Sequence, residues 1–365
     1  MRLLLFADLH LDAPFAWAPV EAARARRRAL RDSLGEICRL AVAERVDALC
    51  CAGDLYEQER FTPDTAAFLR DTFAQVHPLP IYLAPGNHDW LGPASLYHQV
   101  DWTDNVHVFT ADRLVPVTLA DGFTLWGAGH RAPANTPGFL DDFRVDRGGV
   151  NVALFHGSEQ GDLRLQGKDK EPHSPFRESQ IARAGLQHAL VGHFHTPRDA
   201  PLHTYPGNPE PLTFGETGLR GAVLATVGAD GAVTRERHRV SVSEVADIEV
   251  DVSGAAHAQQ VRDRVGQRLA GLAGTIRVTL SGEVGPDLDL RLDDLAEVAP
   301  QLVMVARLGK LTVGYDLDAL ADEPTVRGQF IRDVRGAADL TDDQRRKVLI
   351  TGLRALEGRH DLEVH

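Results

Sequence analysis

Seven side chains of types that bind divalent cations follow short apolar runs along the first 195 residues. They are Asp8, His10, Asp54, Asn87, His156, His193 and His195. Carboxylate, amide and imidazole groups together suit divalent cations of intermediate hardness. Seven ligands suffice for two cations that share one bridging carboxylate, and paired cations are a standard device for cleaving phosphate esters. The pattern therefore predicts a binuclear metal centre that hydrolyses phosphoester bonds.

The spacing within these clusters supports a shared site. Asp8 and His10 alternate along an extended segment, as do His193 and His195. Residues two apart on extended chain point the same way, so each pair can reach one cation. Asp54 follows the next apolar run and can bridge two cations with its two oxygens. Glycines directly precede three of the clusters and allow the chain to turn sharply there.

The two residues after Asn87 are candidates for catalysis rather than for metal binding. His88 directly follows a ligand and should project toward the substrate. A histidine there can stabilise charge that develops on phosphorus or protonate the leaving oxygen. Asp89 could hold the His88 ring in the required tautomer, as a carboxylate does in a catalytic triad.

Each cluster has an ordinary structural explanation when it is taken alone. An Asp-x-His pair is usually a helix cap or a surface pair, and Gly-Asn-His-Asp is a common turn sequence. Together they resist this explanation, because each follows an apolar run. Buried ionisable groups without partners would cost several kcal/mol each.

The elements that must position these residues read as a mixed α/β fold. Apolar runs at residues 2–7, 47–52 and 81–84 predict buried strands, and helical spacing covers residues 20–44 and 63–76. This β-α-β-α-β order implies a parallel sheet with helices on its faces. Further strands are expected at 106–109, 114–119, 123–126, 150–155, 189–191, 202–205, 222–227 and 233–239. We expect a two-sheet β-sandwich with flanking helices, and a long exposed loop at 157–175 near the site.

The pattern changes after residue 240. Residues 241–322 alternate between strand-like and helix-like segments and predict a small α/β capping domain. Residues 323–365 are rich in Arg and Asp and contain one amphipathic helix candidate at 341–356. We expect a phosphoesterase domain at 1–240, the capping domain at 241–322, and a C-terminal helical segment at 323–365 that could dock a partner.

Composition excludes several classes of protein. The net charge of −13 argues against a protein that coats nucleic acid by bulk electrostatics, although bound metals could supply positive charge locally. We find neither a membrane span nor a signal peptide, so the expectation is a cytoplasmic protein that makes no membrane contact. Cys38, Cys50 and Cys51 are expected to be small buried hydrophobes.

The clusters resemble the calcineurin-like metallophosphoesterase superfamily, and within it the DNA-repair nuclease branch typified by SbcD. The resemblance covers residues 1–240. It rests on the clusters above and on the stretch Tyr-Pro-Gly-Asn-Pro-Glu-Pro at 205–211 followed by Gly-Glu at 215–216. Residues 324–330 resemble the YhaO-like subgroup. Two positions depart from the family: Gln-His at 187–188 and His130 stand where Asp-Tyr and an aromatic residue are usual.

The resemblance implies specific roles for these residues. One metal would be bound by Asp8, His10, Asp54 and His195. The other would be bound by Asp54, Asn87, His156 and His193, with His88 as the catalytic histidine. The implied metal is Mn²⁺, with a hydroxide between two ions attacking phosphorus. The family also implies a homodimer and an SbcC-like coiled-coil ATPase as partner.

The sequence thus favours a Mn²⁺-dependent DNA nuclease that acts in double-strand break repair. We expect an exonuclease that acts at DNA ends, with endonuclease activity on single strands or hairpins. Two other functions stay open. One is a phosphodiesterase for a small nucleotide, and the other is a non-catalytic DNA-end scaffold. A protein phosphatase is disfavoured because Asp54 is followed by Leu-Tyr-Glu-Gln and not by the Val-Asp-Arg-Gly of that branch.

Overall fold

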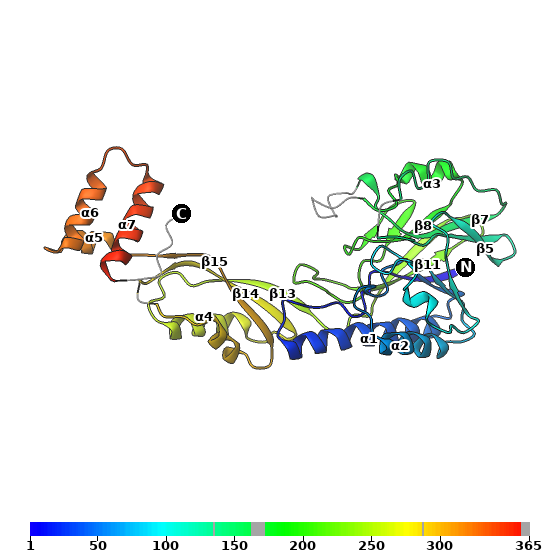
Figure 1. Ribbon diagram of the computed structural model, residues 1–365, viewed down its shortest axis with the longest axis horizontal. Coiled ribbons are helices and arrows are strands. Elements are labelled where there is room, and N and C mark those ends of the chain that lie inside the picture. Colours follow the sequence, from blue (N-terminus) through cyan, green and yellow to red (C-terminus); the bar gives the residue numbers. More distant parts are fainter. Residues whose placement is uncertain (134–135, 162–171, 287, 359–365) are drawn as a thin grey trace. The chain divides into compact units, whose positions relative to one another are not determined.

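The computed structural model describes residues 1–133, 136–161, 172–286 and 288–358. The chain divides into two compact units, Met1–Val245 and Ala246–His365 (Figure 1). The division falls at the start of one strand, Val245–Asp251. No helix in the described part of the chain is both long and apolar enough to cross a membrane.

The first sheet of the N-terminal unit carries the predicted parallel core. Within the described residues its six strands lie in the order β12-β11-β1-β2-β3-β4. Their bounds are β12 Val233–Arg239, β11 Gly221–Val227, β1 Arg2–Phe6, β2 Ala48–Cys51, β3 Ile81–Leu83 and β4 Val106–Val108. Strands β1 to β4 pair in parallel, whereas β11 joins β1 and β12 in antiparallel register.

The second sheet lies in the same unit and has the order β5-β6-β7-β8-β10-β9 in the described residues. Its strands are β5 Val115–Ala120, β6 Phe123–Gly127, β7 Val150–His156, β8 His188–Gly192, β10 His203–Tyr205 and β9 Arg198–Asp199. Strands β6, β7, β8 and β10 run parallel. The carboxyl ends of parallel strands meet at one edge of a sheet, where sites in α/β folds are commonly built.

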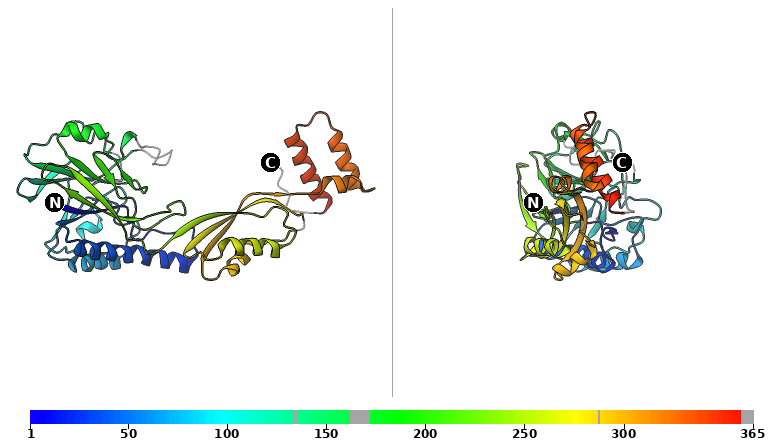
Figure 2. Two further views of the ribbon diagram at one scale, coloured as in Figure 1. Left: turned by 180° about the vertical axis from the view of Figure 1, so that it is seen from behind. Right: turned by 90° about the vertical axis from the view of Figure 1, so that its left-hand side faces the viewer.

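Helices cover both outer faces, so that the N-terminal unit has four layers. Helices α1 (Val20–Ala43) and α2 (Pro63–Ala74) pack on the outer face of the first sheet, and α3 (Glu178–Ala184) packs on the second (Figures 1 and 2). Between the sheets, Leu5 of β1 and Leu154 of β7 belong to one buried apolar cluster. The predicted two-sheet sandwich with flanking helices is confirmed.

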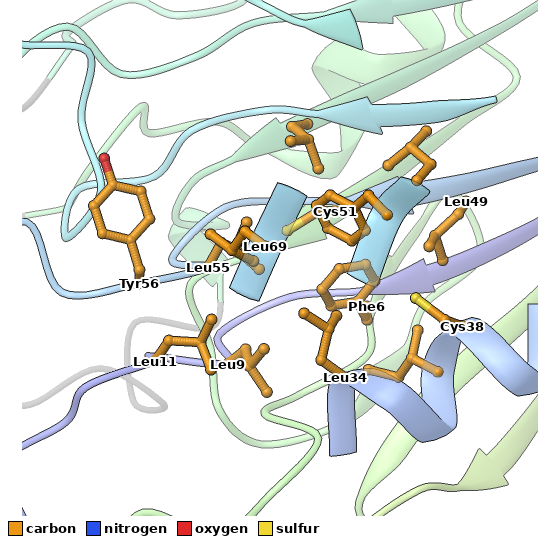
Figure 3. Close-up of a cluster of buried hydrophobic side chains, with 14 of the residues drawn as sticks. Phe6, Leu9, Leu11, Leu34, Cys38, Leu49, Cys51, Leu55, Tyr56 and Leu69 are labelled. Atoms are coloured by element: carbon orange, nitrogen blue, oxygen red, sulfur yellow. The ribbon is translucent and has the colours of Figure 1, made fainter. Parts of the chain in front are cut away.

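The three cysteines fill space in these cores. Cys38 of α1 and Cys51 of β2 lie in the cluster under the helices, together with Phe6 and Leu34 (Figure 3). Cys50 points the opposite way, into the core between the sheets. Burial raises the pKa of the Cys38 and Cys50 thiols to about 12, so both stay protonated. The predicted role as buried hydrophobes is confirmed.

The C-terminal unit contains a three-stranded sheet in the order β13-β14-β15 within its described residues. It comprises β13 Val245–Asp251, α4 Ala258–Leu269, β14 Thr275–Val284, the 3₁₀ helix η3 Leu292–Val298 and β15 Val303–Val313. Strands β14 and β15 pair in parallel, and α4 and η3 share their apolar core. Helices α5 Leu317–Ala321, α6 Val326–Gly336 and α7 Asp342–Leu356 form a second small core.

Two helices, α3 and α5, were not expected from the sequence. Helix α6 lies within the C-terminal segment 323–365, which was expected to be helical. Helices α3 and α5 have only 7 and 5 residues, which is too short for a periodic pattern to stand out. Of the loop expected at 157–175, residues 162–171 lie outside the described part. Ser158 and Ser174 beside them are buried.

Candidate metal centre

The predicted ligands come from five strand ends in the two sheets. Strands β1, β2 and β3 of the first sheet are followed by the residues at 8, 10, 54 and 87. In the second sheet, His156 is the last residue of β7, and His193 directly follows β8. Because both sheets present their carboxyl ends at this edge, residues far apart in the sequence meet there.

Several of these residues sit in an unusual backbone conformation. Asp8, His10, Asp54 and His193 have positive φ angles of 56°, 50°, 54° and 108°. Non-glycine residues rarely adopt this region, and such strain tends to gather at functional sites. Gly86 meets a related constraint, because a Cβ there would collide with the Asp54 carboxylate and lie 2.9 Å from His156 Nδ1. The chain is thus held in a form that brings the ligands together.

The atoms of the predicted ligands form two neighbouring groups joined by Asp54. One group contains Asp8, His10 and His195, and the other contains Asp54, His156 and His193. Asp54 Oδ2 lies 3.3 Å from His156 Nε2 in the second group and 3.6 Å from His10 Nε2 in the first. A single carboxylate oxygen therefore lies between the two groups, as a bridging ligand would.

Asn87 belongs to the second group. Its Oδ1 lies 3.0 Å from His156 Nε2 and 3.2 Å from His193 Nδ1, and these two ring nitrogens are 3.1 Å apart. The structure thus brings together all seven residues predicted to bind metal.

The orientation of three rings suits cation binding. Each holds Nδ1 against an oxygen outside the two groups: His10 with Glu57 Oε1 at 2.8 Å, His156 with the Ala52 carbonyl at 2.9 Å, and His195 with Glu216 Oε1 at 2.8 Å. Carbonyl and carboxylate oxygens only accept, so Nδ1 carries the hydrogen and Nε2 keeps its lone pair toward the site. Metal-binding histidines usually have this second hydrogen bond.

Positive charge is needed where these atoms converge. The lone pair of His156 Nε2 faces Asn87 Oδ1 and Asp54 Oδ2, and electron-rich atoms at such distances repel unless a proton or a cation lies among them. Burial lowers the pKa of His156, but the nearby Asp54 and Asp8 carboxylates outweigh burial and raise this pKa to about 9. The residues present therefore fit two divalent cations.

His88 lies beside the first group and faces outward. Its ring centroid is 4.7 Å from that of His10, and 42% of its side chain is exposed. Nδ1 lies 3.0 Å from Glu57 Oε2. Burial lowers the pKa of His88, but the hydrogen bond to Glu57 and the charge of Asp54 prevail and raise it to about 9. An imidazolium held here can stabilise a phosphate in the site or give it a proton.

Asp89 does not take the role predicted from sequence. Its Oδ1 accepts hydrogen bonds from the backbone nitrogens of Asp54 and Gly86, at 3.1 and 2.5 Å. Its Oδ2 accepts from the Leu55 nitrogen at 2.7 Å and the Tyr97 hydroxyl at 2.6 Å. Asp89 thus ties together the two loops that carry Asp54 and Asn87, while Glu57 holds the ring of His88.

Two further histidines contact candidate ligands without belonging to either ligand group. His130 is buried, and its Nε2 donates to the His156 carbonyl oxygen at 3.0 Å. Burial lowers the pKa of His130 to about 4, so this ring stays neutral. The ring of His173 packs against that of His193 with centroids 5.4 Å apart. His130 therefore supports the backbone of a candidate ligand.

Sequence reasoning missed Glu57 and Glu216, the two carboxylates that orient ligand rings. For each, burial raises the pKa, but hydrogen bonds from the histidines lower it to about 2, so both are ionised. Glu57 stands three residues after Asp54, on the same loop. The short spacing between Asp54 and Glu57 could have indicated that Glu57 lies at the site. Glu216 gives no such signal, because it lies 21 residues from His195 in the sequence.

Comparison with known families agrees with this arrangement. The family model described as "Calcineurin-like phosphoesterase" matches residues 1–197, which is more than half of the chain and contains every predicted ligand. The chain belongs to the calcineurin-like phosphoesterase family. This family uses a dinuclear metal centre, and the two ligand groups described above are the candidates for it. A calcineurin-like phosphoesterase is a phosphoester hydrolase.

Two curated relatives align with most of this phosphoesterase. The uncharacterized metallophosphoesterase YhaO of Bacillus subtilis is 25% identical over 368 residues, which span 95% of this chain and 83% of that protein. The DNA double-strand break repair protein Mre11 of Methanopyrus kandleri is 26% identical over 298 residues, which span 73% of this chain and 62% of that protein.

A solved structure described as a dimetal phosphatase from Danio rerio superposes with a TM-score of 0.38. The alignment covers 62% of this chain and 92% of that chain at 12% identity. A likeness of this degree carries no argument about activity.

Proposed function

We propose that this phosphoesterase is a DNA nuclease that requires two divalent cations, with Mn²⁺ as the working metal. In this proposal it degrades DNA from its ends, can open single strands or hairpins, and serves double-strand break repair. The observation that carries the proposal is the outward-facing ring of His88, fixed by Glu57 beside the ligand groups. The similarity to a protein named as a DNA double-strand break repair protein supports DNA as the substrate.

The chain's own residues have defined tasks in this reaction. Bound cations would supply an activated water and neutralise charge on the phosphate. Glu57 holds the His88 ring and keeps it protonated, so that His88 can hydrogen-bond the phosphate and pass a proton to the leaving oxygen. Asp89 fixes the two loops beneath them. Oxygen and imidazole ligands together suit Mn²⁺.

The acidic charge of the chain limits how DNA can bind. At a net charge of −13, long-range attraction to DNA is not expected, so contact must be local. Two divalent cations and the His88 imidazolium would place positive charge where a phosphate enters. The metal should then be required for DNA binding as well as for the chemical step of cleavage.

The proposed assembly is a homodimer that works with an SbcC-like coiled-coil ATPase. This part rests on the resemblance noted in the sequence. Light scattering on the purified protein tests the dimer directly, since a mass of one chain would contradict it.

The decisive experiment compares end-labelled linear duplex with a closed circle. Both DNAs are incubated with Mn²⁺, Mg²⁺ or chelator, using the wild type, His88→Ala and the exposed control His98→Ala. Loss of the linear form with Mn²⁺ in the wild type and the control, but not in His88→Ala, would support the proposal. If the wild type left both DNAs intact but hydrolysed a small phosphodiester, the substrate would be a small nucleotide. If the wild type cleaved neither DNA nor the small phosphodiester, the result would favour the hypothesis of a non-catalytic DNA-end scaffold.

A further inference from the structure

The segment at residues 206–216, which marks the nuclease branch in the sequence, lies against the metal centre. Glu216 Oε1 is 2.8 Å from His195 Nδ1, and only 14% of the Glu216 side chain is exposed. The other oxygen, Oε2, accepts from Asn208 Nδ2 at 2.7 Å and from the Leu212 nitrogen at 2.6 Å. Glu216 thus cannot turn away from His195 without breaking bonds within its own segment.

Asn208 and Arg220 fix the backbone of His195 as well. Asn208 is fully buried, and its Nδ2 also donates to the Glu210 carbonyl at 2.9 Å. Arg220 Nη1 donates both to the His195 carbonyl and to Asn208 Oδ1. Gly207 has a φ of 74°, and a Cβ there would lie 2.6 Å from the His195 carbonyl oxygen. Ring and backbone of His195 are therefore both held by this segment.

A buried ion pair anchors the segment on helix α1. Glu210 Oε1 lies 3.2 Å from Arg26 Nη1, and the side chains are 0% and 4% exposed. Glu210 Oε2 also accepts from Ser33 Oγ at 3.0 Å and from the Val242 nitrogen at 2.9 Å. Arg26 in turn donates to the Pro211 carbonyl. Arg26 is therefore buried, although it lies within the Arg-rich stretch 24–31.

We propose that Glu216 is a positioning residue that holds His195 with Nε2 toward the metal centre. The Glu210–Arg26 pair anchors the segment 206–216 for this purpose. This inference rests on the proposed metal centre. It goes beyond that centre because it gives a positioning role to residues that contact neither cation nor substrate. Carboxylates that orient ligand histidines commonly affect metal affinity by about 10–100-fold.

The test titrates metal-free protein with Mn²⁺ in a calorimeter and compares the wild type with Glu216→Ala and Glu216→Gln. In Glu216→Ala, one of the two sites should weaken by about 10–100-fold while the other changes less than about twofold. Glu216→Gln should recover part of the loss, because its amide oxygen can still accept from Nδ1 of His195. A purely structural role would weaken both sites together.

A matched control is available in Glu178, which forms a Glu–His pair away from the ligands. Glu178 Oε1 lies 3.4 Å from His203 Nδ1, and Glu178→Gln should leave both sites unchanged. Wild-type affinity at both sites in a folded Glu216→Ala protein would overturn the inference. Equal weakening of both sites would overturn it as well.

The anchor is tested separately with Glu210→Gln and the milder Ser33→Ala. Both should weaken the same site as Glu216→Ala, but by less, because they loosen the segment without removing the carboxylate. If Glu210→Gln does not fold, Ser33→Ala still removes one hydrogen bond to Glu210. Unchanged Mn²⁺ binding in a folded anchor variant with a lowered melting temperature would refute the anchoring role.

DNA takes no part in these titrations. A wild type that binds two Mn²⁺ ions but cleaves no DNA would contradict the proposed function and leave this inference standing. A wild type that binds no cation would contradict the metal centre itself.

Discussion

Glu57 Oε2 lies 3.0 Å from His88 Nδ1, while the other oxygen of the same carboxylate lies 2.8 Å from His10 Nδ1. One side chain therefore orients a candidate metal ligand and the candidate catalytic histidine together. Both hydrogen bonds come from ring nitrogens to an ionised carboxylate, which makes them stronger than neutral ones. Removing Glu57 should consequently impair both metal binding and catalysis, whereas removing His88 should impair catalysis alone.

Variants at these two positions should separate binding from chemistry. His88→Ala should lower the cleavage rate by about 10²–10⁴-fold without changing the number of bound Mn²⁺ ions. Glu57→Gln should lower the rate and also weaken one metal site by about 10–100-fold. Steady-state kinetics at saturating metal, together with calorimetric titration, distinguish these outcomes. A His88→Ala protein that retains the wild-type rate would remove His88 from the reaction.

Asp89→Asn should destabilise the fold more than it changes the chemistry. The buried carboxylate accepts four hydrogen bonds, and an amide NH₂ group in its place leaves at least one backbone N–H facing a donor. The expected loss is about 1–3 kcal/mol in the free energy of unfolding, measured with urea. Asp104→Asn, at a carboxylate that is 88% exposed, is the control and should stay within about 0.5 kcal/mol. Equal stabilities would argue against this structural role.

Gly86→Ala should disrupt the metal centre by steric overlap alone. The added Cβ would collide with the Asp54 carboxylate and lie 2.7 Å from the Asp54 backbone nitrogen, so the bridging residue must move. We expect weaker binding of both cations, because Asp54 is shared by the two groups. Gly35→Ala in helix α1 is the control, since a Cβ there meets nothing within 4 Å. Wild-type Mn²⁺ affinity in Gly86→Ala would show that the site tolerates a displaced Asp54.

His188 should make the fold sensitive to acid. It is buried, and burial, reinforced by the charges of Arg235 and His203, lowers its pKa to about 3. The unfolded chain binds this proton below about pH 6.5, whereas the folded chain does not. The contribution to stability is therefore complete above pH 6.5 and declines as the pH falls toward 3. At pH 5 the loss should reach about 2 kcal/mol.

Urea unfolding of the wild type and of His188→Gln at pH 7.5 and pH 5 measures this loss. The difference between the two proteins should shift by about 2 kcal/mol in favour of the variant at the lower pH. Parallel pH dependences would mean that His188 takes up its proton in the folded state.

The ligands and their strands could be predicted because two strong signals coincide. Apolar runs mark buried strands, and polar residues directly after them lie at one edge of a parallel sheet. Asp8, Asp54 and His156 are found in this way without knowledge of any contact. The convergence of the second sheet on the same edge follows from the topology, which the order of elements implies.

The supporting residues could not be predicted in the same way. Asp89 follows His88 in the sequence, yet its carboxylate turns to backbone nitrogens about 35 residues earlier in the chain. Glu216 reaches His195 only after the segment 206–216 has folded back on α1. Such contacts depend on the path of the loops, for which single carboxylates in a sequence give no spacing rule. The short helix α3 escaped prediction because it makes too few turns.

The central claim is that two cations share Asp54 between the two ligand groups. The most direct test is an anomalous difference map from crystals of the wild type soaked in Mn²⁺. Two peaks are expected about 3.5–4 Å apart, one on each side of the Asp54 carboxylate. A single peak, or peaks that do not contact Asp54, would contradict a binuclear centre bridged by Asp54.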